Sequence, residues 1–296
     1  MRILMCVPNI SEGKVLETVE QIVDQVRQVA GVKILDYSSD PDHNRSVLTY
    51  MGEPEPVVEA TKGMAAKAFD LIDMTKHHGS HPRMGAVDVV PFIPVRGIDT
   101  QEVVETARQF GGFVGRLGIP VYYYEDAATR PERTSLVEIR RGEYEGLPEK
   151  LKRPEWKPDE GPAIFNPKSG AMVTGARFPL IAFNVNLSTP DLSVAKRIAD
   201  AVRYVKGGYR FVRAMGLSLK NQGMVQVSMN LTNYIRTPIP RVLETIRSEA
   251  ARHGVSVAGC ELVGPIPLGA VEEVLKHYLQ LHDFSMQQII ENALIE

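Results

Sequence analysis

The residues best suited to chemistry lie in one segment, Lys76-His77-His78-Gly79-Ser80-His81-Pro82-Arg83-Met84-Gly85, which holds three of the chain's seven histidines. An unperturbed imidazole has a pKa of ~6.5, so it can both accept and donate a proton near neutral pH. Pro82 restrains the backbone after His81, and the neighbouring glycines allow tight turns. The segment could therefore hold a proton-transfer imidazole, although by spacing alone a solvated surface loop explains it equally well.

The same histidines could instead bind zinc, with Asp73 or Asp88 as a further ligand. The spacing is weakly against this alternative, because His77 and His78 are adjacent and tend to diverge in an extended loop. No other cluster of His, Cys or acidic residues offers a helical His-x-x-x-His pair, and the two cysteines are too far apart in the sequence for a zinc or redox motif. We therefore predict no metal site.

Two further polar segments could bind substrates. Ser38 to Ser46 has the composition of a turn, but within it Arg45 carries a guanidinium group suited to a carboxylate. Gly161 to Arg177 combines small residues, which let the backbone approach a flat ligand, with Phe165, which could stack on a ring, and with the cation Lys168. A flexible linker is the alternative for this second segment.

The elements that must position these segments follow a βαββαβ order in the first half of the chain. Alternating and helical hydrophobic spacing predict them. The predicted strands are Ile3 to Asn9, Val32 to Tyr37, Ser46 to Gly52 and Ala86 to Pro94, and the predicted helices are Leu16 to Val29 and Pro56 to Ile72. A helix at Gln101 to Leu117, a strand at Val121 to Glu125 and a helix at Arg133 to Gly142 are additions to that core.

The second half repeats this order after a connector. Pro148 to Pro167, rich in Pro, Gly and charged residues and containing the only tryptophan, is predicted to run over the surface. The strands that follow are Leu180 to Leu187, Val212 to Leu219, Met224 to Asn233 and Ser256 to Val263; the helices are Leu192 to Val205, Pro240 to His253, Ala270 to Leu281 and another to Ile295. We predict an α+β protein with two tandem ferredoxin-like domains, residues 1–178 and 179–296.

Each such sheet has one face without helices, and two strands of the second domain indicate what that face carries. Polar side chains alternate with apolar ones along them, so they project to one side. A solvated face is one interpretation; a ligand-binding face is the other, because amides and hydroxyls dominate rather than Lys and Glu. The residues concerned are Asn184, Asn186, Gln226, Ser228 and Asn230.

The overall composition excludes several classes of protein. Of the 296 residues 44% are hydrophobic and 24% charged, and the net charge of -2 gives no field of one sign, so a nucleic-acid or membrane-surface binder is not expected. No apolar run approaches the ~20 residues that span a bilayer. The first residues lack the features of a signal peptide, and we expect a cytoplasmic protein.

Several segments together carry the pattern of a known family. They are Cys6-Val7-Pro8-Asn9-Ile10-Ser11-Glu12-Gly13, Asn44-Arg45-Ser46, Asp73-Met74, His81-Pro82-Arg83-Met84-Gly85-Ala86, Pro91-Phe92-Ile93-Pro94-Val95-Arg96-Gly97, Gly142-Glu143-Tyr144-Glu145, and Ala176-Arg177 through Asn184-Val185-Asn186-Leu187. Over nearly its whole length the chain resembles the formiminotransferase family. The resemblance implies that His81 is the catalytic residue and that the sheets of the two domains face a tunnel in a homodimer. It places the folate-binding segment on Gly161, Pro162, Ala163, Ile164, Phe165, Asn166, Pro167, Lys168, Ser169 and Gly170.

The reaction that the resemblance implies moves a formimino group from N-formimino-L-glutamate to N5 of tetrahydrofolate. His81 would carry the proton from N5 to the departing glutamate nitrogen. The glutamate carboxylates need cations, for which Arg45 and Arg83 are the first candidates, and Lys168 and Arg177 the second. An N-formylglutamate-using formyltransferase and a non-catalytic folate-binding protein are the alternatives.

Two departures from the family pattern matter. The animal members continue into a cyclodeaminase domain, whereas this sequence stops at Glu296, so we expect its folate product to pass to a separate enzyme. Two places after the aspartate that matches Asp36, those members have an acidic residue where this chain has Ser38, with Asp40 and Asp42 close by. The acidic partner of His81 therefore stays open.

Overall fold

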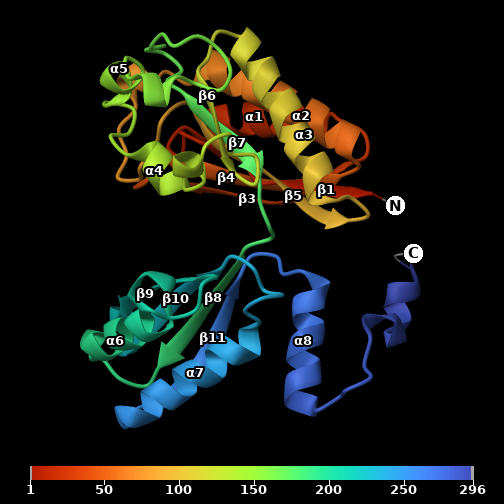
Figure 1. The fold of residues 1–296 in the computed structure, drawn as a ribbon, viewed down its shortest axis with the longest axis vertical. Helices are drawn as coiled ribbons and strands as arrows, with labels where there is room; N and C mark the ends of the chain where they lie inside the picture. The colour runs from red at the N-terminus through yellow and green to blue at the C-terminus, as the bar shows by residue number, and fades with distance from the viewer. Residues whose placement is uncertain (1, 295–296) are drawn as a thin grey trace. The chain divides into compact units, whose positions relative to one another are not determined.

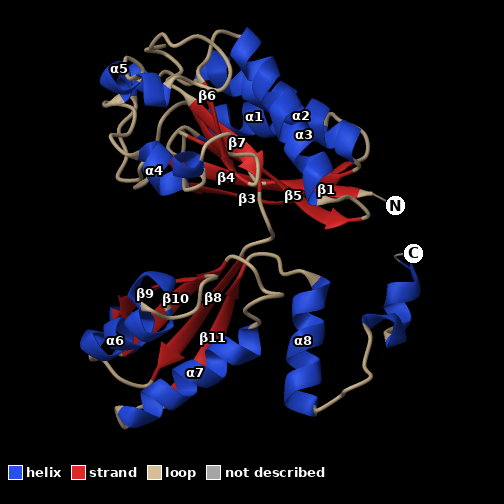
Figure 2. Ribbon diagram, in the orientation of Figure 1, coloured by secondary structure: helices blue, strands red, loops and turns tan. Residues whose placement is uncertain are grey.

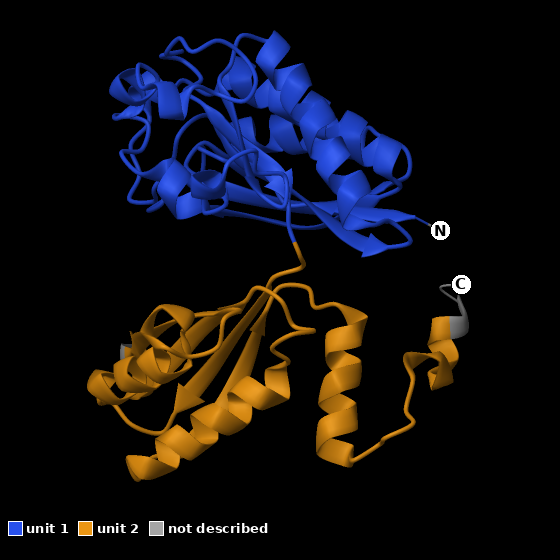
Figure 3. Cartoon of the chain, viewed as in Figure 1, with its two compact units in different colours: residues 1–177 blue, residues 178–296 orange. Residues whose placement is uncertain are grey.

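The chain folds into two compact units, residues 1–177 and 178–296, which are described separately here (Figure 3). The computed structural model describes residues 2–294. Each unit has a sheet and a hydrophobic core of its own. The α+β class predicted from the sequence is confirmed.

The core of unit 1 has the predicted βαββαβ order. Its strands lie in the order β5-β1-β4-β3 with antiparallel neighbours, which is the arrangement of a ferredoxin-like sheet, and β2 continues the line of β1 between β4 and β5. The bounds are β1 Ile3–Cys6, β2 Asn9–Ile10, α1 Leu16–Arg27, β3 Val32–Asp40, β4 Arg45–Gly52, α2 Pro54–Leu71 and β5 Val87–Arg96.

Two parallel strands extend this sheet beyond β5. β7 (Met172–Ala176) pairs with β5, and β6 (Val121–Glu125) pairs with β7 on its other side. The sequence predicted β6 but no strand at residues 172–176, which fell within the segment interpreted as ligand-binding or, alternatively, as a flexible linker, so β7 was missed. All five residues of β7 are buried, so the segment lacks the alternation that marks a strand with one solvated face.

Helices cover one face of this sheet completely and the other in part. α1, α2 and α3 (Thr100–Arg116) pack on one face, where Leu48, Tyr50 and Phe92 meet them (Figure 1). A smaller cluster on the opposite face joins β5, β6 and β7 to two short helices, α4 (Leu136–Arg140) and α5 (Leu147–Lys150). Single 3-10 turns lie at Met74–Lys76, Pro131–Arg133 and Pro154–Trp156.

Unit 2 has a four-stranded ferredoxin-like sheet without the additional parallel strands of unit 1. The strand order is β11-β8-β10-β9, and all neighbouring strands are antiparallel. Val185 and Val227 face a core that α6 and α7 close on one side of the sheet (Figure 2). The bounds are β8 Ile181–Leu187, α6 Leu192–Val202, β9 Val212–Leu219, β10 Met224–Leu231, α7 Ile239–Arg252, β11 Val257–Val263 and α8 Leu268–Leu279, with 3-10 turns at Tyr204–Lys206, Lys220–Gln222, Met286–Gln288 and Ile290–Leu294.

The end of the chain differs from the prediction of a second closing helix. Two 3-10 turns follow α8 instead, and Ile295 lies outside the described residues. Over residues 2–294, no helix is both long and apolar enough to cross a membrane.

Candidate functional site

The histidine segment runs from the 3-10 turn at Met74–Lys76 to β5, and its three histidines differ in their surroundings. His78 is exposed. His77 is buried, with Nε2 2.8 Å from the carbonyl oxygen of Asn44, to which it donates, and Nδ1 accepting from Nε of Arg83 at 3.3 Å. Both ring nitrogens of His77 are therefore occupied in holding the loop.

His81 instead lies against a cation. Nη1 of Arg45 is 2.7 Å from Nε2 of His81, while Nδ1 of His81 is buried and has no hydrogen-bond partner among the described residues. Arg45 begins β4 on the face opposite Leu48 and Tyr50, which places it on the side of the sheet that carries α4. Burial, together with the charges of Arg45 and Arg140, lowers the pKa of His81 to about 4, so the ring is neutral at pH 7.

A buried ion pair flanks this contact. Asp88 is 1% exposed, accepts a hydrogen bond from the backbone N–H of Met84 at 2.8 Å and pairs with Arg140 of α4. Burial raises the pKa of Asp88. Sequence reasoning considered Asp88 only as a metal ligand and missed Arg140, because nothing in a short amphipathic helix 59 residues after His81 indicates that it returns to the histidine loop.

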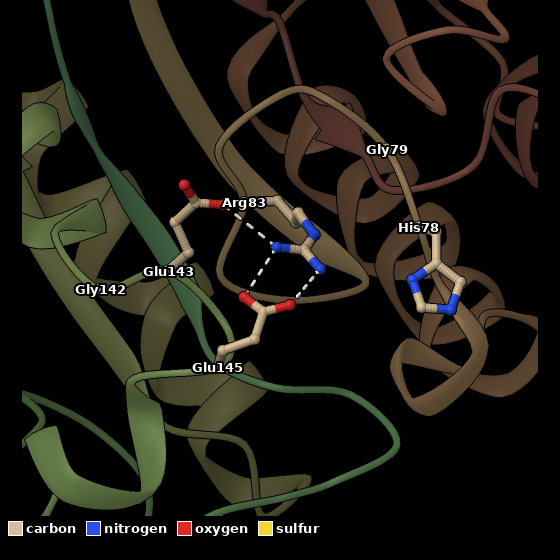
Figure 4. Close-up of a pocket in the computed structure, with 6 residues that line it drawn as sticks. All are labelled: His78, Gly79, Arg83, Gly142, Glu143 and Glu145. Atoms are coloured by element: carbon tan, nitrogen blue, oxygen red, sulfur yellow. Dashed lines mark hydrogen bonds and ion pairs between the residues drawn. The ribbon is translucent and has the colours of Figure 1, made fainter.

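Arg83, two residues after His81, forms ion pairs with two glutamates. Its side chain is 8% exposed; Nη1 lies 3.1 Å from Glu143 and 2.9 Å from Glu145, and Nη2 lies 2.6 Å from Glu145 (Figure 4). These hydrogen bonds lower the pKa of Glu145. Arg83 thus links the histidine loop to the segment between α4 and α5, next to an open pocket of about 470 Å³ lined by His78, Gly79, Arg83, Gly142, Glu143 and Glu145.

The segment Gly161–Gly170 lies directly against the histidine loop. Two backbone hydrogen bonds join the two, Ala86 N–H to Ser169 and Met74 N–H to Lys168, and the next residue, Ala171, donates its N–H to Met84. Gly170 has a φ of +69°, and a Cβ there would be 2.2 Å from the carbonyl oxygen of Met84. Only a glycine allows this approach of one backbone to the other.

Within that segment the side chains divide into structural and accessible ones. Nζ of Lys168 donates to the carbonyl oxygen of Asp70 at 2.7 Å. Ile164 is 70% exposed, whereas Phe165 is half-buried with its ring 5.4 Å from that of Tyr144. Tyr144 also donates through its hydroxyl to the carbonyl oxygen of Pro167 at 2.5 Å. The segment is therefore held at its end and middle, with apolar surface at Ile164.

The predicted polar face of unit 2 is present on adjacent strands. Gln226 lies opposite Asn186, and Nε2 of Gln226 donates to Oδ1 of Asn186 at 2.9 Å. Glu261 of β11 accepts from Gln226 at 3.0 Å and from Asn184 at 3.3 Å. Ser228 and Asn230 continue the same face of β10. Glu261 was missed, because β11 is exposed on both faces and its sequence shows no alternation.

Among residues 2–294, no group of three or more His, Cys, Asp or Glu side chains could hold a metal ion. The geometry around His81 offers a neutral imidazole for proton transfer and neighbouring groups for hydrogen bonding or ion pairing. His81, Arg45, Arg83 and the segment Gly161–Gly170 belong to unit 1, and the five predicted polar residues of the second sheet belong to unit 2.

Comparisons with known proteins match both units. A family model described as the formiminotransferase domain, N-terminal subdomain, covers residues 3–177, and one described as the formiminotransferase domain covers residues 182–296. Proteins named glutamate formimidoyltransferase from Streptococcus pyogenes serotype M1 and Thermoplasma acidophilum are each 46% identical to this chain; the alignments cover 99% of this chain and 99% and 98% of those proteins. The formimidoyltransferase-cyclodeaminase of Mus musculus is 45% identical over 94% of this chain, which matches 52% of that longer protein.

Proposed function

Because the chain belongs to the formiminotransferase family, we propose that it is a glutamate formimidoyltransferase, with N-formimino-L-glutamate as donor and N5 of tetrahydrofolate as acceptor. The products are 5-formimidoyltetrahydrofolate and L-glutamate, which places the reaction in histidine degradation and one-carbon metabolism. Identity of 46% to two proteins of that name, along nearly the whole chain, supports this proposal.

The reaction requires one proton to be accepted and one to be delivered. N5 of tetrahydrofolate attacks the amidine carbon, and the resulting tetrahedral intermediate collapses with departure of the glutamate nitrogen. N5 must lose its proton, and an amine leaves readily only when protonated. A single imidazole can do both, which typically accelerates a reaction by ~10²- to 10⁴-fold.

The observation that carries the assignment of this role to His81 is the position of its ring. It lies on a loop that abuts the segment Gly161–Gly170 through backbone hydrogen bonds, and the ring is neutral. Arg45 and Arg140 make the surroundings cationic, which suits the anionic donor. Orientation of the two substrates supplies a further part of the rate.

Tetrahydrofolate binds, in this proposal, at Gly161–Gly170. The exposed Ile164 and the half-buried ring of Phe165 offer apolar surface to a flat pteridine ring. Lys168 shapes the segment, since its ammonium group donates to the carbonyl oxygen of Asp70. Folate binding at this place would set the acceptor beside the loop that carries His81.

Arg45 is the favoured partner for a glutamate carboxylate. Arg83 was an equal candidate from the sequence, but its guanidinium already bonds to Glu143 and Glu145, so its task is to hold the loop. The amides and hydroxyls of unit 2 at Asn184, Asn186, Gln226, Ser228 and Asn230 are proposed to hydrogen-bond substrate polar groups. We further propose a cytoplasmic homodimer, which sedimentation would test.

The test is an optical assay of the folate product, with tetrahydrofolate and either N-formimino-L-glutamate or N-formyl-L-glutamate as donor. We expect turnover with the formimino donor, and a fall in kcat of ~10²- to 10⁴-fold for His81→Ala. The exposed His78, three residues earlier on the same loop, provides the matched control, because His78→Ala should keep near-normal turnover.

The possible outcomes separate the alternatives. Turnover only with the formyl donor would replace the proposal with a formyltransferase. Saturable folate binding without product from either donor would indicate a binding protein. Near-normal activity of His81→Ala would remove His81 from the mechanism while leaving the reaction itself established.

A further inference from the structure

The contact between Arg45 and His81 blocks the group that should act as the base. A guanidinium group carries only hydrogen-bond donors, so Nε2 of His81 accepts at 2.7 Å and the proton of the neutral ring lies on Nδ1. One ring nitrogen then holds a proton, and the lone pair of the other is already used. A ring in this state cannot take the proton that N5 must lose.

Arg45 is also the cation of this site with the least satisfied charge. None of the ion pairs formed by residues 2–294 includes Arg45, and its Nε is buried without a hydrogen-bond partner there. The two nearby carboxylates are engaged elsewhere, one with Arg140 and one with a histidine. The charged and titratable groups around His81 are Arg45 at the start of β4, Arg140 on α4, Asp88 on β5, and Asp40 with its partner His43 at the turn after β3.

A carboxylate would be a better partner for Arg45 than a neutral imidazole. A guanidinium–carboxylate pair forms two parallel hydrogen bonds between opposite charges, whereas the contact with His81 is one hydrogen bond from the cation to a neutral acceptor. We infer that Arg45 is a carboxylate-responsive switch: it occupies the Nε2 lone pair of His81 until a carboxylate of the donor substrate binds it, and this pairing frees the ring for proton transfer. The inference rests on the proposed function and names Arg45 as a positioning residue within it.

The switch makes proton transfer depend on the donor's acidic groups. Once Nε2 is released, it accepts the N5 proton as the N5–carbon bond forms, and the imidazolium returns a proton to the glutamate nitrogen as that carbon–nitrogen bond breaks. Burial is the larger cause of the low pKa of His81, and the field of Arg45 adds to it. Pairing cancels that field, so the pKa of His81 should rise from about 4. An amidine without a carboxylate would leave His81 blocked.

The test follows the His81 ring by NMR in protein labelled with ¹⁵N-histidine, with its signals assigned from His81→Gln. In the wild-type protein without substrate we expect a neutral Nδ1–H ring that does not titrate between pH 5.5 and 8, a range on the order of one unit either side of the unperturbed value. Saturating glutarate should shift the Nε2 resonance, because the hydrogen bond from Arg45 is lost, and should raise the pKa of the ring, whereas the neutral diamide glutaramide should do neither. In Arg45→Gln the pKa of the ring should be raised without any ligand, because the charge at position 45 is gone.

Arg141→Gln is the matched control, since Arg141 is 75% exposed and pairs with Glu138; it should behave as wild type. The inference is overturned if wild-type His81 titrates near its unperturbed pKa, or if glutarate leaves the ring unchanged. The glutarate arm needs no variant, so it decides the matter even where Arg45→Gln fails to fold. All these readouts are independent of turnover, whereas failure of the proposed function would appear as absent transfer by the wild-type protein.

Discussion

Replacing Gly170 by alanine should disrupt the junction between the proposed folate-binding segment, Gly161–Gly170, and the histidine loop. Two contributions to the loss of stability, the strain of a left-handed backbone and the steric conflict of a Cβ, can be separated with a matched variant. Gly170 and Gly118 both have a left-handed backbone, with φ of +69° and +80°, so alanine costs about 1–2 kcal/mol at either position. At Gly118 a Cβ meets nothing within 4 Å, whereas at Gly170 it would lie 2.2 Å from a backbone oxygen. The difference between the variants therefore isolates the backbone contact.

The expected loss of unfolding free energy is about 1–2 kcal/mol for Gly118→Ala and more than ~4 kcal/mol for Gly170→Ala, in the range reserved for severe steric conflict. Urea unfolding measures both, and fluorescence of Trp156, the only tryptophan, reports on unit 1 alone. Gly170→Ala should also weaken tetrahydrofolate binding. Equal losses of stability in the two variants would refute the reasoning, because they would mean that the two loops separate without cost.

Two further predictions concern buried groups. Asp159→Asn should lower the free energy of unfolding of unit 1 by about 3–5 kcal/mol in the same urea assay. The reason is that Arg133, whose side chain is 1% exposed and 2.9 Å from Asp159, would lose its charge partner. A loss below ~1 kcal/mol would show that Arg133 is solvated. Cys260 should react faster with a thiol reagent than Cys6 in the native protein. Burial raises the pKa of both thiols, but Cys6 is buried and its pKa is about 12, whereas Cys260 is exposed; equal rates would contradict the burial of Cys6.

Local patterns predicted most of the elements and failed where burial removes the pattern. The amphipathic helices and the alternating strands β4, β8 and β10 each expose one face, so their hydrophobic period is visible in the sequence. β7 is covered on both faces and contains Gly175, and no strand was predicted there. Its partner β6 was found as a strand, but the parallel pairing that brings the two together is a tertiary property.

The site was predictable as separate segments but not as an arrangement. Residue types indicated the histidine segment and Arg45, and the family resemblance selected His81 among the three histidines. The 2.7 Å contact between Arg45 and His81 depends on how β4 and the histidine loop pack. Arg83 was proposed for substrate because an unpaired arginine suits a carboxylate; its two glutamate partners lie some 60 residues away and have no local signal. Long-range charge pairing of this kind appears only when the chain is folded.

The position of β7 also has a consequence for the order of events during synthesis. The histidine loop is fixed at one side by residues 168–171, and these are in turn fixed by β7, which lies between β5 and β6. Contacts so distant in the sequence must wait until both partners have left the ribosome. His81 therefore emerges nearly a hundred residues before the strand that sets its loop in place. A nascent chain that stalls before residue 177 would carry His81, the proposed catalytic residue, on a loop that is not yet held in place.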